Sequence, residues 1–273
     1  MSMHDEHDHD DHGGLHRDLR STSAALDRRG LLKVAARFGV TFSALHLFGC
    51  SSSDAATLTG TDPSGNCVAK VPEETAGPFP GDSSNGPNVL NQTGVVRGDI
   101  RSSFAGLSGT AAGVPLAIEL TIVSASSCTP LAGYAVYLWH CDRDGNYSLY
   151  SSGATNQNYL RGVQAADSTG KVRFTSIFPG CYSGRWPHIH FEVYSSLTAA
   201  TAVSNRIATS QIALPKSACD TVYATSGYSA SVANLSRTSL AGDMVFSDGA
   251  SLELATVSGD VTNGLTAALT VGV

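Results

Sequence analysis

The sequence predicts an all-β protein: a single β-sandwich domain with long loops, preceded by a disordered leader and a signal segment. Two observations support this prediction. Small and β-favouring residues (Gly, Ala, Ser, Thr, Val) dominate the 273 residues, whereas Lys and Glu are scarce, so a helical bundle is disfavoured. From residue 67 onward, short apolar stretches alternate with turn clusters, and no helical apolar period continues over three turns.

The overall composition excludes several classes of protein. Hydrophobic residues make up 42% and charged residues 15% of the chain, as in an ordinary globular protein. The mean hydropathy is near zero, which excludes a protein with many membrane spans. The net charge of −6 argues against a general affinity for nucleic acid, so no nucleic-acid partner is expected.

Residues 1–49 have the features of a leader followed by an export signal. The His- and Asp-rich run 4–12 fits either a metal-binding tract or a solvated, disordered leader. Arg28-Arg29 and Lys33 then precede a weakly apolar stretch, 34–48, which is too short to span a membrane. This order is typical of a twin-arginine signal.

The signal ends in a sequence that resembles a lipoprotein cleavage box. Leu47-Phe48-Gly49 precedes Cys50, and three serines follow this cysteine. We therefore expect lipidation at Cys50, which places the protein in the cell envelope with the lipid anchor as its one membrane contact. Residues 50–66 are rich in Ser, Thr, Gly, Asp and Pro and predict a flexible tether. The β-sandwich domain is expected over 67–273.

Strand signals recur through the domain. Apolar residues alternate with others over 116–122, which is typical of a half-buried strand. Further strands are expected at 135–141, 171–177, 188–194, 211–214 and 244–246. Turn clusters at 142–146 and 167–170 separate them.

Five cysteines follow Cys50, at positions 67, 128, 141, 181 and 219. Disulfides persist in exported proteins, so two structural bridges and one free thiol are the simplest expectation. No two cysteines have the C-x-x-C spacing, which argues against a zinc ribbon and a thioredoxin-like site.

His188 and His190 are the clearest candidates for chemistry. Residues two apart on a strand point the same way, so both imidazoles lie on one face and Ile189 lies on the other. Such a pair is either a ligand pair for one metal ion or a packing pair. Tyr182 precedes His188 by six residues, enough chain to cross a turn and return the phenol to the pair.

Five segments in order resemble the intradiol ring-cleavage dioxygenases, the family of catechol and protocatechuate dioxygenases. They are Glu74-Thr75-Ala76-Gly77-Pro78-Phe79, the stretch from Trp139 to Ser148 with its Gly-x-Tyr ending, the span from Leu160-Arg161-Gly162 to Ile177, Arg185-x-x-His188-x-His190, and Ser210-Gln211. The resemblance covers most of the chain from Cys67 to about Leu214 and implies a homodimer.

The resemblance implies a non-haem Fe(III) site with Tyr147, Tyr182, His188 and His190 as ligands. The donor set suits that metal, because ferric iron is a hard cation and prefers anionic oxygen. It also implies that Tyr182 leaves the metal when substrate binds and accepts a substrate proton. Arg185 then corresponds to the arginine that stabilises negative charge on the ring, and Gln211 to a pocket glutamine. Gly77, Pro78 and Phe79 would line the entrance.

The implied reaction uses O₂ to open the ring of a small aromatic diol, giving a dicarboxylate of the cis,cis-muconate type. Export is unusual for enzymes of aromatic degradation, and the linker between Tyr182 and His188 is short. Cys181 and Cys219 are additions to the family pattern, so we expect them to form a bridge that clamps the loop carrying Tyr182. The loops that select among catechols have no fixed motif.

Two other functions fit parts of the sequence. One is a non-catalytic envelope lipoprotein that binds a metal, a catechol siderophore or a carbohydrate. The other is a copper or zinc hydrolase that uses the His188/His190 pair. The hydrolase lacks a third ligand at motif spacing, because His140 is expected to point away from Tyr147.

Overall fold

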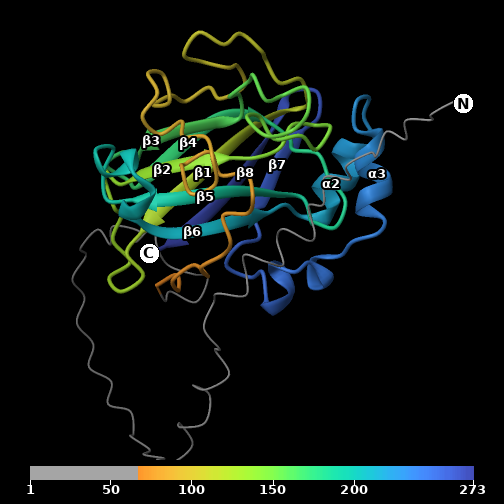
Figure 1. Cartoon of the computed structure of the whole chain (residues 1–273). Coiled ribbons are helices and arrows are strands. Elements are labelled where there is room, and N and C mark those ends of the chain that lie inside the picture. Colours follow the sequence, from red (N-terminus) through yellow and green to blue (C-terminus); the bar gives the residue numbers. More distant parts are fainter. Residues whose placement is uncertain (1–66) are drawn as a thin grey trace, which may run out of the picture.

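The computed structural model describes residues 67–273. The predicted signal segment 1–49, the lipidation site Cys50 and the tether 50–66 therefore lie outside the described residues. Two four-stranded sheets dominate the described part and pack face to face, which confirms the predicted all-β sandwich (Figure 1). Within residues 67–273, no helix is both long and apolar enough to cross a membrane.

The first sheet has the strand order β4-β1-β8-β7. Its strands are β1 (Pro115–Val123), β4 (Lys171–Ile177), β7 (Thr256–Asp260) and β8 (Gly264–Gly272). β1 pairs with β4 antiparallel and with β8 parallel. Burial alternates along β1, so one face of this sheet meets the core and the other meets water.

The second sheet has the order β3-β2-β5-β6, and all its pairs are antiparallel. Its strands are β2 (Ala135–Trp139), β3 (Arg161–Ala165), β5 (His188–Tyr194) and β6 (Arg206–Ala213). Trp139 pairs with His190 across β2 and β5, and His190 pairs with Gln211 across β5 and β6. The three side chains therefore lie in one row on one face.

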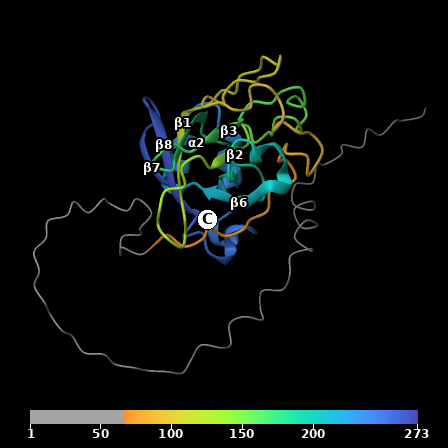
Figure 2. The ribbon, with the colours of Figure 1, turned by 90° about the vertical axis from the view of Figure 1, so that its left-hand side faces the viewer.

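β2 and β5 are buried along their whole length, which β1 is not. The inner faces of the two sheets share one apolar core, to which Ile118, Phe174, Ile189 and Phe191 belong. The outer face of the second sheet carries another buried cluster, covered by the loops around residues 76–104 and 140–160; it includes Val89, Phe104, Tyr137, Trp139 and Tyr147. Figure 2 shows these loops beside β2 and β3 of the second sheet. This covered outer face is where the polar side chains of β5 lie.

A helical segment follows the second sheet. It comprises α2 (Lys216–Tyr223), α3 (Ser229–Leu235), and the 3₁₀ turns η5 (Leu240–Gly242) and η6 (Phe246–Asp248). Two further 3₁₀ turns, η3 (Ala199–Thr201) and η4 (Val203–Asn205), connect β5 to β6. α2 and α3 lie side by side at one end of the sandwich (Figure 1).

The structure confirms most predicted strands and corrects one. Strands 171–177 and 188–194 have the predicted limits, and β1, β2 and β6 differ from the predictions at their ends. The strand predicted at 244–246 is wrong. The carboxylate of Asp243 accepts hydrogen bonds from the backbone N–H groups of Val245 and Phe246, which favours a tight turn over an extended chain. β7 and β8 were not predicted, because their small residues give little apolar contrast.

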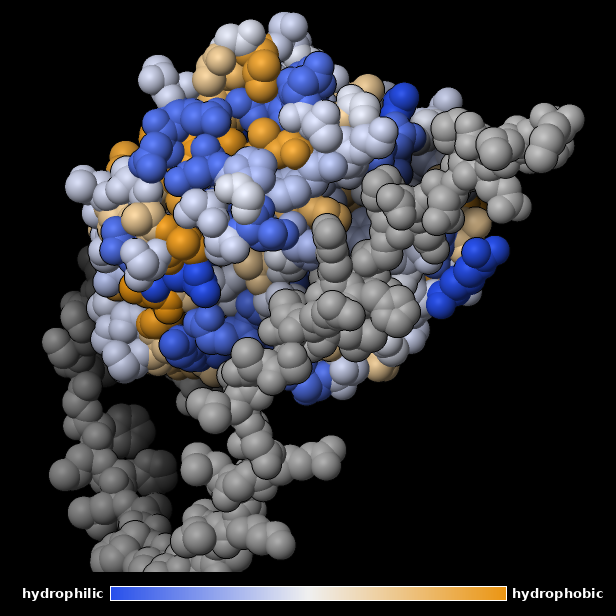
Figure 3. All heavy atoms as spheres, viewed as in Figure 1, coloured by the Kyte–Doolittle hydropathy of each residue, from blue (hydrophilic) through white to orange (hydrophobic). Residues whose placement is uncertain are grey.

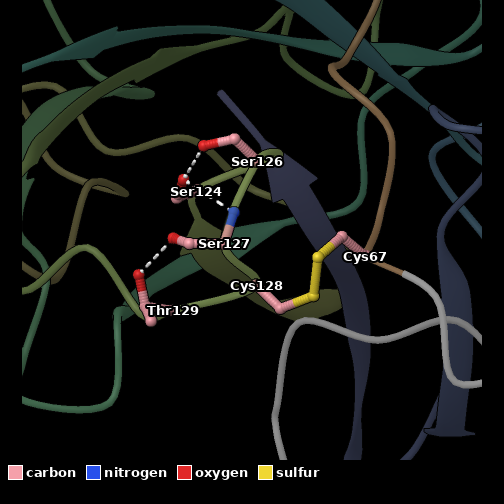
Figure 4. Close-up of a disulfide and its surroundings, with 6 residues drawn as sticks. All are labelled: Cys67, Ser124, Ser126, Ser127, Cys128 and Thr129. Atoms are coloured by element: carbon pink, nitrogen blue, oxygen red, sulfur yellow. Dashed lines mark hydrogen bonds between the residues drawn. A yellow bond between two sulfur atoms is a disulfide. The ribbon is translucent and has the colours of Figure 1, made fainter.

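The disulfide pattern also differs from the prediction. A bridge joins Cys67 to Cys128 with their Cα atoms 4.9 Å apart, and Cys128 lies in the serine-rich turn after β1 (Figure 4). Closing a loop of 61 residues stabilises the fold by about 4 kcal/mol. The predicted Cys181–Cys219 bridge is wrong: both thiols are free and buried, and each contacts a backbone carbonyl instead. Cys141 is also free, so the described residues contain one bridge and not two.

The surface of the domain is mixed in polarity. On the face shown in Figure 3, apolar residues form small separate patches among hydrophilic ones. Large exposed apolar side chains are scattered along the chain, at Val96, Leu107, Leu197, Ile207, Val232 and Leu254. Single exposed apolar residues of this kind are ordinary on a protein surface.

Candidate metal centre

Four side chains converge on the outer face of the second sheet. The Nε2 atom of His188 lies 3.1 Å from Nε2 of His190, 3.2 Å from the Tyr182 hydroxyl and 3.3 Å from the Tyr147 hydroxyl. Both histidines and Tyr147 are buried, whereas Tyr182 is partly exposed. The structure thus brings together the four residues that the sequence predicts as ligands.

Local structure explains how the two histidines and the two tyrosines are positioned. On β5, His188 and His190 point outward while Ile189 and Phe191 enter the core. Tyr147 follows a turn held by the Asp142 carboxylate, which accepts hydrogen bonds from the N–H groups of residues 144 and 146. Gly145 in that turn has a φ of +88°, and a Cβ there would lie 3.0 Å from Cβ of Tyr182. This glycine lets the two tyrosine loops pack together.

The two imidazoles are oriented by different means. His188 donates from Nδ1 to the Trp186 carbonyl at 2.5 Å, which leaves the Nε2 lone pair facing the cluster. His190 stacks on Trp139, with ring centroids 4.9 Å apart and planes 4° apart. Nδ1 of His190 is buried and has no hydrogen-bond partner. Stacking therefore replaces the usual hydrogen bond behind this ring.

Burial has the largest effect on the pKa values of the cluster. Burial is the main cause that lowers the pKa values of His188 and His190 well below 6.5. The charge of Arg185 lowers the pKa of His188 further, and His188 does the same to His190. Both imidazoles are therefore neutral. Burial, followed by repulsion from Tyr182, raises the pKa of Tyr147 well above 10. A buried phenol of this kind ionises at neutral pH only beside a strong positive charge.

The donor set fits ferric iron. Within residues 67–273 no group of three or more His, Cys, Asp or Glu side chains could hold a metal ion. The cluster instead combines two imidazoles with two tyrosine hydroxyls. Two neutral imidazoles and two phenols that become phenolates offer mixed nitrogen and anionic oxygen donors. That combination suits a hard trivalent metal better than zinc or copper.

Arg185 and Gln211, both predicted from the sequence, lie beside the cluster. Nη1 of Arg185 is 3.5 Å from Nε2 of His188, and Nη2 donates to the Gln211 side-chain oxygen at 2.7 Å. Gln211 in turn donates to the Thr75 carbonyl at 2.8 Å. Burial lowers the pKa of Arg185, but attraction by Tyr182 and Asp243 outweighs burial and raises it overall. The guanidinium therefore stays charged in a buried position.

The predicted entrance segment, Gly77, Pro78 and Phe79, also lies at the cluster. The Phe79 ring is 4.9 Å from the Tyr147 ring. Gly77 has a φ of +68°, and a Cβ on it would lie 3.4 Å from Cε1 of His190. A glycine is required here because other residues rarely adopt this φ. Gly77 and Phe79 therefore lie directly against two of the four side chains of the cluster.

Sequence reasoning missed Arg161, which ties this entrance segment to the Tyr147 loop. The buried guanidinium donates to the carbonyls of Phe79, Pro80 and Ser148 at 2.9, 2.7 and 2.9 Å. The segment Leu160-Arg161-Gly162 carried the resemblance, but nothing in it indicated these partners. An arginine donates up to five hydrogen bonds, and this capacity suits it to join two loops.

Asp243 was missed as well. Its carboxylate is buried and pairs with Nε of Arg185 at 3.0 Å. The sequence carries no signal for this contact, because 58 residues separate the two partners. α3 also holds the tyrosine loop: Ser231 accepts from the Cys181 N–H at 2.9 Å, and Asn234 donates to the Cys181 carbonyl at 2.7 Å.

His140 stands outside the cluster, as expected from the sequence. Its Nδ1 contacts the Cys141 carbonyl and its Nε2 contacts the Ser176 hydroxyl, both at 2.7 Å. Because both ring nitrogens are used, His140 has no lone pair free for a metal.

Comparisons with known proteins show similarity to dioxygenases in sequence and in fold. A family model described as "Dioxygenase" matches residues 85–202, which include the two tyrosines and two histidines of the cluster. Chlorocatechol 1,2-dioxygenase of Rhodococcus opacus is 39% identical over 57 residues, which are 21% of this chain and 22% of that protein. An intradiol ring-cleavage dioxygenase from Tetranychus urticae has a similar fold, with a TM-score of 0.58 and 23% identity over 75% of this chain and 94% of that one.

Proposed function

We propose that this chain is an intradiol ring-cleavage dioxygenase, a non-haem Fe(III) enzyme that opens a catechol-type ring with O₂; its similarity to known dioxygenases in sequence and in fold supports the proposal. The product is a dicarboxylate of the cis,cis-muconate type. One observation carries the proposal: the hydroxyls of Tyr147 and Tyr182 and Nε2 of His190 all lie within 3.3 Å of Nε2 of His188. A non-catalytic binding lipoprotein and a zinc or copper hydrolase are both less consistent with a donor set that contains two phenols, of which Tyr147 is buried.

Tyr147, Tyr182, His188 and His190 hold the iron in this proposal. When bound, ferric iron would supply Lewis-acid chemistry for the reaction of the diol with O₂. The two imidazoles are neutral before the metal arrives, so their lone pairs are free to bind it. The phenols give up their protons on binding, which makes iron loading dependent on pH.

The two tyrosines have different roles because their surroundings differ. Tyr147 is buried under Phe79, which favours a permanent ligand. Tyr182 is partly exposed on a loop, so it is the ligand that departs and takes a proton from the incoming diol. Gly77, Pro78 and Phe79 offer an apolar wall for the ring.

Arg185 stabilises negative charge on the substrate ring. Its guanidinium is buried 3.5 Å from Nε2 of His188, where little water screens it. Gln211 accepts a hydrogen bond from Arg185 and donates one to the Thr75 carbonyl, so it links the arginine to the entrance segment.

The proposed setting is the cell envelope. The Cys67–Cys128 bridge supports an oxidising compartment. We propose that lipid attached at Cys50 anchors the enzyme there and that it acts as a homodimer on a small aromatic diol. Cell fractionation of wild type and Cys50→Ala tests the anchor, since the variant is expected to leave the membrane fraction. Sedimentation of the purified protein tests the dimer.

Oxygen uptake by the iron-loaded protein tests the activity. Catechol, hydroxyquinol and protocatechuate are supplied separately, and the product mass is determined for each. We expect a coloured protein, because phenolate bound to Fe(III) absorbs visible light, and a product that is heavier than its substrate by both atoms of O₂. A colourless protein that consumes no oxygen with any of the three diols would exclude this function.

A further inference from the structure

We propose that Asp243 is a positioning residue for the ring-cleavage reaction. It holds Arg185 in the one orientation that turns the Nη1 amino group toward the metal-ligand cluster. The inference rests on the proposed function, and it adds a residue from the helical segment that lies outside the span matched by the dioxygenase family model.

The Asp243 carboxylate makes five contacts, all in the interior. Oδ2 accepts from Nε of Arg185 at 3.0 Å and from the Trp186 N–H at 2.6 Å. Oδ1 accepts from Nη2 of Arg185 at 3.4 Å and from the N–H groups of Val245 and Phe246 at 2.8 and 3.3 Å. One carboxylate therefore joins the start of the ligand strand to the turn after η5.

These contacts determine which nitrogen of Arg185 faces the cluster. Nε is held by Asp243, and Nη2 is shared between Asp243 and the Gln211 oxygen at 2.7 Å. Nη1 is the remaining nitrogen, and it points at Nε2 of His188 from 3.5 Å. Because the guanidinium is planar, anchoring two of its nitrogens also fixes the third.

The side chains of this pair are 3% and 0% exposed for Arg185 and Asp243, so water cannot replace either partner. Removing the carboxylate leaves the arginine charged and held only through Nη2 by Gln211, so the guanidinium can turn away from the cluster. The expected defect is thus one of position. It should lower kcat, where charge on the ring develops, and have little effect on the binding of the ground-state diol.

The first test compares Asp243→Asn with wild type in steady-state oxygen uptake with catechol. We expect kcat to fall about 10-fold or more and KM to change less than about 3-fold. Iron content and the visible band of the substrate-free enzyme should remain those of wild type, since no ligand is touched. Asp248→Asn, an exposed carboxylate five residues away, is the matched control and should keep wild-type kcat.

A double-variant cycle asks whether Asp243 acts through Arg185. Asp243→Asn should cost about 10-fold in the wild-type background and nothing further in the Arg185→Ala background. Two equal and independent losses would overturn the proposal, because Asp243 would then act by another route.

The same cycle is read without catalysis from the melting temperature of the metal-free protein. Arg185→Ala leaves a buried carboxylate without its counter-ion, so adding Asp243→Asn should raise the melting temperature of that variant. A further fall in the melting temperature would contradict the proposed pairing of Asp243 with Arg185.

Asp243→Glu covers the case in which the asparagine variant does not fold. The longer side chain keeps the charge but displaces the guanidinium, so iron should stay bound while kcat falls. Wild-type kcat in every folded Asp243 variant would overturn the inference. Absence of turnover in the wild type would instead count against the proposed function, and the melting cycle would still test the pair.

Discussion

β1 and β5 have the same alternation of apolar and polar residues, yet of these two strands only β5 contributes residues to the candidate metal centre. In β1, Ala117, Glu119 and Thr121 are half-buried at the surface while their neighbours enter the core. In β5, His188, His190 and Glu192 occupy the equivalent alternate positions, and every residue of the strand is buried. The difference is the second layer of loops over the outer face of β2 and β5. Polar side chains on a sheet face become a reactive site when another layer excludes water.

The largest effect, a loss of bound iron, is expected when one of the four donor side chains on the covered face is removed. His188→Ala and Tyr147→Phe each remove one of four donors, so both should abolish iron content and the visible band, measured by metal analysis and absorption. His140→Asn is the control, because this histidine already uses both ring nitrogens elsewhere. It should cost stability and leave iron in place. Full iron in both ligand variants would remove the assignment.

A smaller effect is expected when the site is left intact but its charge is removed. Arg185→Ala should lower turnover by roughly 100-fold while iron stays bound, because the cation acts on substrate charge and ligates nothing. Turnover by the iron-loaded variant, normalised to iron content, is the measurement. Unchanged turnover would make Arg185 a purely structural partner of Asp243.

The core-facing side of the second sheet gives a contrasting test, because burial there disfavours the ionised form of a carboxyl group. Glu253 is buried and accepts from Ser210 on the core side of β6, and burial raises its pKa from 4.5 to about 8. Since the folded pKa is the higher one, the stability that Glu253 contributes is full below about pH 4.5 and is lost as the pH rises through 8.

Urea denaturation at pH 5 and pH 8 should therefore show the wild type losing stability relative to Glu253→Gln. The loss is at most about 1.4 kcal/mol per pH unit in this interval. The same pH dependence in both proteins would mean that Glu253 is ionised in the folded state.

The smallest effect is expected on the water-exposed face of the first sheet. Glu119 on β1 pairs with Arg173 on β4 and lies 3.7 Å from Lys171. Exposed pairs of this kind contribute about 0–1 kcal/mol, so Glu119→Gln should change the free energy of unfolding by no more than that. Iron content and turnover should match the wild type. A loss of iron in this variant would break the contrast between the two strands.

Much of the fold followed from local pattern. Alternation located β1, β4 and β5 because a strand that meets an apolar core on one side must repeat every two residues. The same period placed His188 and His190 on one face. β7 and β8 were not predicted, because their residues are small and give little apolar contrast. The prediction of a strand at 244–246 was wrong, because the Asp243 carboxylate accepts a hydrogen bond from the backbone of this segment.

What the sequence by itself determined is the set of donor types and their spacing, since strand geometry is a local property of the chain. The tertiary structure alone decided that His190 is held by the Trp139 ring, that Arg161 joins the two loops, and that Asp243 pairs with Arg185. It also decided that Cys181 and Cys219 remain thiols. A single carboxylate or thiol is not part of a repeating sequence pattern, so the sequence does not indicate its partner. The partner depends on how distant segments of the chain pack together. That docking is driven by burial of the whole core, which no single motif encodes.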